Sequence, residues 1–314
     1  MKTDSLPPPV WDILRLTAKK ARPIDALCER IGINAETFAD AVEAANAAGF
    51  RVRVVDGFVS SRAPAIQALG APVELGDRRP GRKRVALVTD LHFGSAHTNQ
   101  KGLHAFLTYA KARGVSTIVC TGDILDGNKD VLLHDQNRIG WDNQAAEAVA
   151  AIRQHAFRWV AIDGNHDGYF SASAGTISGR LLESEMRAAG VDWTFAGVCL
   201  GRAVVHGARW LLWHPHGGAS TRNAIRRILN SKIEGLEEPA DVVAIGHFHK
   251  FATVAAYPEG VFGIAGGTFQ EKKSEFANRI SNGWDIGGAI VSWTLDKEGN
   301  TSEYAAEFYP VPGN

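Results

Sequence analysis

Five short apolar runs, each followed within three residues by an Asp, Asn or His, constrain the fold of this chain more than any other feature. The runs occupy residues 85–88, 117–120, 159–162, 210–213 and 242–245. Because they are rich in strand-forming residues and do not alternate with polar positions, we expect strands buried on both faces. Polar residues just beyond the carboxyl ends of such strands lie at one rim of a sheet, where ligands bind. The sequence therefore predicts an α/β fold that gathers metal-binding side chains at one edge.

The polar segments after these runs form an ordered series of five motifs. They read D-L-H at 90–92, G-D-I-L-D-G at 122–127, G-N-H-D at 164–167, H-P-H-G-G at 214–218 and G-H-F-H at 246–249. This series resembles the calcineurin-like metallophosphoesterase family over roughly residues 84–293, and the segment 266–270 resembles the continuation in its phage and archaeal members. The resemblance implies a four-layer α-β-β-α sandwich over residues 85–314.

The resemblance also implies two divalent cations that share one bridging carboxylate, Asp123. One cation is expected on Asp90, His92, Asp123 and His249. The other is expected on Asp123, Asn165, His214 and His247. Mixed nitrogen and oxygen ligands without thiolate suit transition metals better than Ca²⁺ or Mg²⁺. We therefore expect manganese, with iron, zinc or nickel as alternatives.

The remaining motif residues suggest the catalytic groups. His166 corresponds to the family's histidine that faces the substrate, where it would stabilise the transition state and protonate the leaving oxygen. Asp167 could orient His166. In the fourth motif we favour His214 over His216 as the metal ligand, because His214 directly follows the strand. His216 would then be a residue at the rim that meets the substrate.

Four residues are candidates for substrate binding. They are His216, Gly217, Tyr169 and Lys129. Gly217 lets the backbone approach a phosphate because glycine lacks a Cβ. Lys129 lies in a polar insertion over residues 128–142, directly after the second motif. Tyr169, expected in a loop, would either stack on a base or form the pocket wall.

Residues 1–62 form a separate predicted module. Three helices and a hairpin over residues 10–61 resemble a winged helix-turn-helix, which suggests DNA binding through the third helix. The exposed acids Glu36, Asp40 and Glu43 on that helix would repel phosphates, so a protein-interaction or dimerisation module is the alternative. Residues 63–84 are expected to be a linker whose basic end, 78–84, either is a solvated hinge or holds nucleic-acid backbone.

Composition indicates the cellular compartment of the protein and the partners it attracts. The formal net charge is +0, so there is no overall attraction to nucleic acid or membranes. The three cysteines, Cys28, Cys120 and Cys199, are widely spaced and predict reduced thiols. The start of the chain lacks the apolar core of a signal peptide, and no apolar stretch is long enough to span a membrane. We therefore expect a cytoplasmic protein, with its oligomeric state open.

These features together predict a dinuclear metal-dependent phosphoesterase. It would hydrolyse phosphodiester bonds by attack of a metal-activated hydroxide. DNA or RNA is the expected carrier of the ester, because of the first module and the basic linker. Two alternatives remain: a phosphomonoesterase that acts on a protein or small molecule, and a non-catalytic nucleic-acid-associated protein of the same fold.

Overall fold

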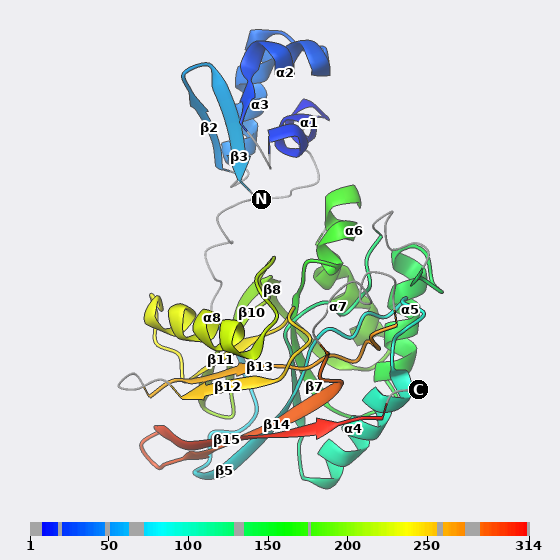
Figure 1. Cartoon of the computed structure of the whole chain (residues 1–314), viewed down its shortest axis with the longest axis vertical. Helices are drawn as coiled ribbons and strands as arrows, with labels where there is room; N and C mark the ends of the chain where they lie inside the picture. Colours follow the sequence, from blue (N-terminus) through cyan, green and yellow to red (C-terminus); the bar gives the residue numbers. More distant parts are fainter. Residues whose placement is uncertain are drawn as a thin grey trace. The chain divides into compact units, whose positions relative to one another are not determined.

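The chain consists of two compact units, Met1–Gly70 and Ala71–Asn314. A computed structural model, drawn in Figure 1, describes residues 8–17, 21–47, 51–62, 72–128, 135–174, 177–255, 260–273 and 283–312. None of the helices in these ranges has the length and apolar character needed to cross a membrane.

The first unit combines three helices with a small antiparallel sheet. The helices are α1 (Pro8–Thr17), α2 (Ile24–Ile31) and α3 (Ala35–Ala47), and the sheet has the order β1 (Arg22–Pro23), β3 (Phe58–Arg62), β2 (Arg51–Val55). Val10, Ile13, Leu27, Phe38 and Val59 are buried in its core. The helices and the hairpin agree with the predicted elements, and β1 was not predicted. The likeness to a winged helix-turn-helix stays a prediction.

The second unit is built on two mixed six-stranded sheets. The first sheet has the order β15 (Thr301–Pro310), β14 (Gly287–Leu295), β5 (Gly81–Val88), β6 (Thr117–Cys120), β7 (Arg158–Asp163), β8 (Asp192–Val198). The second has the order β12 (Ala252–Ala255), β13 (Phe262–Ala265), β11 (Val242–Ile245), β10 (Ala208–Trp213), β9 (Leu200–Val205), β4 (Val73–Leu75). All five predicted strands are present, in β5, β6, β7, β10 and β11. Within each sheet the neighbours among them are parallel.

The sheets pack face to face, and helices cover their outer faces (Figure 1). Val85 and Leu87 of β5 share a buried core with Trp210 and Leu212 of β10. On the other side of the first sheet, Ala86 and Val88 share a core with α4 (Gln100–Ala112), α5 (Trp141–Ile152) and α7 (Ser178–Ala188). The helix α8 (Arg222–Glu234) contacts β11, β12 and β13 of the second sheet. The predicted four-layer sandwich is confirmed, and burial of both strand faces explains why the apolar runs do not alternate.

The boundary between the units differs from the predicted one. Part of the expected linker, 63–84, belongs to the second unit, because β4 pairs with β9 and β5 begins at Gly81. Arg82 and Lys83 therefore lie on a strand paired with β14. Lys83 binds Asp77, and Arg82 donates a 2.8 Å hydrogen bond to Ser292. The charge of the basic stretch is thus partly neutralised, and its end is fixed in a sheet. A solvated hinge would have neither property.

One predicted loop is helical. Residues 168–170 lie in α6 (Asp167–Ala174), which begins at the last residue of the G-N-H-D motif. Asp167 is the first residue of this helix, where a negative charge is favourable to the helix dipole, and its carboxylate accepts a 2.8 Å hydrogen bond from the amide of Gly164. The helix therefore follows the third motif directly and carries Tyr169 next to the candidate site.

Candidate metal centre

The seven predicted metal ligands converge at the carboxyl ends of five strands. They are Asp90 and His92 after β5, Asp123 after β6, Asn165 after β7, His214 after β10, and His247 and His249 after β11. Because β5, β6 and β7 are parallel, their ends meet at one edge, and the ends of the parallel pair β10 and β11 meet the same edge. The sheet topology therefore brings together residues that are far apart in the chain.

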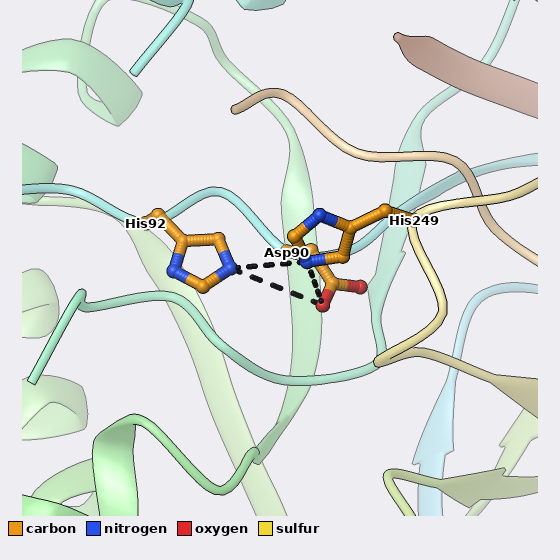
Figure 2. A group of neighbouring side chains, drawn as sticks. All are labelled: Asp90, His92 and His249. Atoms are coloured by element: carbon orange, nitrogen blue, oxygen red, sulfur yellow. Dashed lines mark hydrogen bonds and ion pairs between the residues drawn. The ribbon is translucent and has the colours of Figure 1, made fainter. Parts of the chain in front are cut away.

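Asp90, His92 and His249 form the first group of candidate ligands (Figure 2). Nε2 of His249 lies 3.1 Å from Oδ1 of Asp90 and 3.3 Å from Nε2 of His92. Nε2 of His92 lies 4.0 Å from Oδ1 of Asp90. These three atoms face one point, as ligands of a single cation do.

The second group contains Asp123, His214 and His247, with Asn165 beside them. Nε2 of His214 lies 3.2 Å from Oδ2 of Asp123 and 3.1 Å from Oδ1 of Asn165. The same amide oxygen lies 2.9 Å from Nδ1 of His247. Carboxylate, amide and imidazole donors of this kind fit a divalent transition ion.

One carboxylate oxygen links the two groups. Oδ2 of Asp123 lies 3.2 Å from His214 of the second group and 3.9 Å from His92 of the first. The predicted bridging residue therefore lies between the two sets of donors. Gly164 makes this placement possible, because a Cβ there would come within 2.1 Å of the other Asp123 oxygen.

Hydrogen bonds leave the metal-facing nitrogens of two histidines available. Nδ1 of His214 lies 2.7 Å from the carbonyl oxygen of Thr121, and Nδ1 of His92 lies 3.0 Å from a carboxylate oxygen of Asp126. An N–H donated from Nδ1 fixes the tautomer in which Nε2 carries a lone pair. Both rings are thus oriented to present Nε2 to a cation.

The electrostatics of the centre favour bound positive charge. Burial raises the pKa of Asp123, but the charges of His214 and His166 outweigh it and hold the pKa well below its usual range. Burial lowers the pKa of His214, but Asp123 raises it to about 9. Burial and the charge of His214 lower the pKa of His247 to about 4. The buried carboxylates thus hold a proton on one histidine, and a cation bound there would replace it.

Five of the candidate ligands have a backbone conformation that side chains other than glycine rarely adopt. The φ angles of Asp90, His92, Asp123, His247 and His249 are 53°, 52°, 52°, 80° and 54°. Residues held in this left-handed region cost on the order of 1–3 kcal/mol each, and they cluster at functional sites. The strained turns after the strands aim these side chains inward.

His166 and Asp167, the predicted catalytic pair, have separate roles in the structure. Nδ1 of His166 lies 2.7 Å from the carbonyl oxygen of Asp126, and the ring lines the cavity beside the metal-binding residues. Asp167 is buried and accepts hydrogen bonds from the backbone amides of Ile124 and Leu125. The prediction that Asp167 orients His166 is therefore wrong, because the carboxylate points to these amides and the carbonyl of Asp126 orients the ring.

The candidate substrate residues lie in different places. The ring of Tyr169 packs against His166 at a centroid distance of 5.2 Å. His216 and Gly217 are exposed, and neither lines the cavity over the metal groups. Lys129 lies outside the described residues. The choice of His214 over His216 agrees with this geometry, although the ligand roles of all these residues stay predictions.

Sequence reasoning missed two residues of the site. Asp126 binds His92 through its side chain and His166 through its carbonyl, and its place in the G-D-x-x-D-G motif was a signal that could have found it. Trp284 lines the cavity, and its ring lies 4.2 Å from that of His249 between centroids. It lies well beyond the last motif and belongs to none of the five, so no sequence signal pointed to it.

The chain is similar in structure to several known proteins. The 5′-nucleotidase precursor from Thermus thermophilus has a TM-score of 0.42 and 11% identity over 73% of this chain, which spans 54% of that protein. A hypothetical protein from the same organism has a TM-score of 0.38 and 12% identity, covering 73% of this chain and 100% of that one. Vps29 from Chaetomium thermophilum has a TM-score of 0.35 and 10% identity, covering 73% and 99%.

A comparison with curated proteins found no match to this chain. The family is instead shown by a family model that matches its sequence. The model of the calcineurin-like phosphoesterases matches residues 83–251, just over half of the chain, and this range contains all seven candidate ligands and His166. The chain therefore belongs to the calcineurin-like phosphoesterase family.

Proposed function

We propose that this protein is a two-metal phosphodiesterase, with Mn²⁺ as the metal and nucleic acid as the carrier of the ester. The observation that carries the proposal is the position of Asp123, whose Oδ2 faces both groups of donors while His166 lines the adjoining cavity. Asp90, His92, Asp123 and His249 would hold one cation, and Asp123, Asn165, His214 and His247 the other. Two bound cations supply a nucleophile at neutral pH and neutralise charge that develops on a phosphoryl group.

In this proposal His166 assists the leaving group. The carbonyl of Asp126 accepts a hydrogen bond from Nδ1, so Nε2 is the nitrogen that can exchange a proton with the substrate. The edge of the ring also packs against His92 at a centroid distance of 4.6 Å, which restricts its rotation. A proton delivered from Nε2 to the leaving oxygen would lower the barrier most for poor leaving groups.

The charge of the cavity favours a diester over a monoester. Among the described residues that line it there is no Lys or Arg, while Asp126 and Asp135 add carboxylates beyond the predicted ligands. A phosphomonoester brings close to two negative charges at neutral pH, whereas a diester brings one. In such an acidic cavity, two cations compensate the single negative charge of a diester more readily than the two negative charges of a monoester.

The first unit would locate the enzyme on its substrate without taking part in the reaction. All candidate ligands lie in the second unit, and no described residue of the first unit belongs to a candidate metal group. The exposed acids Glu36, Asp40 and Glu43 on α3 argue against insertion of this helix into a DNA groove. We therefore assign the unit a positioning role, through either a partner protein or nucleic-acid backbone.

A substrate panel with Mn²⁺ tests the proposed function. The panel compares bis(p-nitrophenyl) phosphate, p-nitrophenyl phosphate, single-stranded DNA and duplex DNA. We expect turnover of the diester and of single-stranded DNA, with lower kcat/KM for the monoester. Turnover of the monoester alone would refute the proposal.

The variant His166→Ala tests the role of the histidine. It should retain both metals, because His166 is not a predicted ligand, and should lose about 10²–10⁴-fold in kcat. The loss should be larger for an alkyl leaving group than for p-nitrophenolate. Equal losses for the two leaving groups would show that His166 does not act as the acid.

A further inference from the structure

An aromatic side chain forms one wall of the cavity over the metal centre. The cavity has a volume of about 220 Å³ and is lined by His166, His249, Phe248 and Trp284. Phe248 is almost fully buried, whereas Trp284 is half-buried. Trp284 is thus the large aromatic ring in this wall that a ligand can reach.

The backbone next to Trp284 holds it in a fixed position. The amide of Asp285 donates a 2.9 Å hydrogen bond to the carbonyl of His249. The Asp285 carboxylate accepts bonds of 2.7 and 2.8 Å from Nη2 of Arg222, and one of 2.9 Å from the amide of Phe251. With this backbone fixed and its ring packed against His249, the indole of Trp284 loses little conformational entropy when a ligand binds.

Trp284 differs in its position from the four tryptophans of the sandwich cores. Trp159, Trp193, Trp210 and Trp293 are fully buried in the cores of the sandwich. Trp284 instead lies with its ring at 72° to that of His249, beside a predicted metal ligand. A half-buried indole in the cavity wall beside a predicted metal ligand is suited to contact with a planar part of a substrate.

We propose that Trp284 stacks on a nucleobase next to the scissile phosphate. The proposal rests on the proposed function and names its substrate as an unpaired nucleotide strand. The cavity is smaller than the ~300–1,000 Å³ typical of drug-sized ligand sites, so it suits one base beside a phosphate. A base held in a duplex is already stacked on its neighbours and cannot reach the indole.

Two chromogenic diesters test the stacking directly. Thymidine 5′-(p-nitrophenyl phosphate) and methyl p-nitrophenyl phosphate release the same leaving group, and only the first carries a base. Trp284→Leu should raise KM for the thymidine ester by about 5- to 150-fold, the range expected for loss of one base stack. It should leave KM and kcat for the methyl ester, and the metal content, within about twofold of wild type. Trp284→Phe retains a stacking ring and should restore most of the affinity.

Trp141→Phe is the matched control. Trp141 is also half-buried, but its indole donates a 3.0 Å hydrogen bond to Ser178 and it does not line the cavity. This variant should bind both esters like wild type. If Trp284→Leu raises KM equally for both esters, or for neither, the stacking proposal is wrong while the phosphodiesterase function stands. If wild type turns over neither ester, the proposed function itself fails.

Discussion

Removing the carboxylate of Asp126 should weaken metal binding without touching any predicted ligand. Asp126 is buried, and its Oδ1 lies 3.0 Å from Nδ1 of His92 while its Oδ2 accepts a 3.0 Å bond from Gln136. Loss of a partner that orients a ligating histidine typically costs 10–100-fold in metal affinity. At 1.36 kcal/mol per factor of ten, this is about 1.4–2.7 kcal/mol.

The variants Asp126→Asn and Asp126→Ala should lose metal affinity by different amounts within that range. Asp126→Asn retains an acceptor for His92 and loses only the charge, so we expect about a tenfold weaker affinity. Asp126→Ala also removes the acceptor and leaves Gln136 without this partner, so we expect about a hundredfold. Both variants retain the backbone carbonyl that binds His166, and kcat at saturating metal should therefore stay within about threefold.

Activity measured against buffered free Mn²⁺ gives both quantities in one experiment. Asp135→Asn is the control, because Asp135 lines the same cavity but its carboxylate lies 3.3 Å from Nε2 of His97. Thermal melts of each variant in excess metal check that the fold is retained. An unchanged metal dependence in Asp126→Ala, or a hundredfold drop in kcat at saturating metal, would refute this reasoning.

Three further predictions concern other parts of the chain. His214→Ala should lose about one metal equivalent, because its Nε2 lies among the donors, whereas the exposed His216→Ala should retain full occupancy; full occupancy in the first variant would reverse the assignment. Deletion of residues 1–70, which leaves both sheets complete, should raise KM for long DNA while kcat for a small chromogenic diester is unchanged; unchanged KM for long DNA would remove the positioning role. His206→Asn should reduce the loss of stability on acidification. Burial lowers the pKa of His206 in the folded protein, so below pH ~6.5 the unfolded chain takes up the proton first. The free energy of unfolding of wild type should therefore fall by up to about 1.4 kcal/mol per pH unit. Urea midpoints at pH 7 and pH 5 would show this, and equal shifts in both proteins would refute it.

The sequence predicted the strands and the rim residues because both depend on local patterns. An apolar run such as 117–120 must be buried, and the polar residue after it, Asp123, must then lie at a strand end. To predict the fold from these strands, only their parallel order was also required, and the family resemblance implied that order. The layers and the convergence of the candidate ligands followed from that order.

Other parts depended on contacts that no local pattern contains. Asp167 follows His166 directly, yet the start of α6 turns its carboxylate toward amides 42 and 43 residues earlier in the chain. The strand β4 has only three residues and is defined by its pairing with β9, which lies far along the chain. Trp284 reaches the cavity through the backbone bond between Asp285 and His249. In each case the partner is distant in sequence, so residue type and spacing could not reveal it.

The left-handed turns that carry the candidate ligands also set a limit on how this protein can be stabilised. Glycine adopts a positive φ with little strain, so His249→Gly or Asp90→Gly would relieve part of a cost on the order of 1–3 kcal/mol per residue. A library selected for heat resistance alone, without metal, should therefore accumulate glycine at the positions that bind the metals. Directed evolution of a more robust enzyme must select for activity in every round.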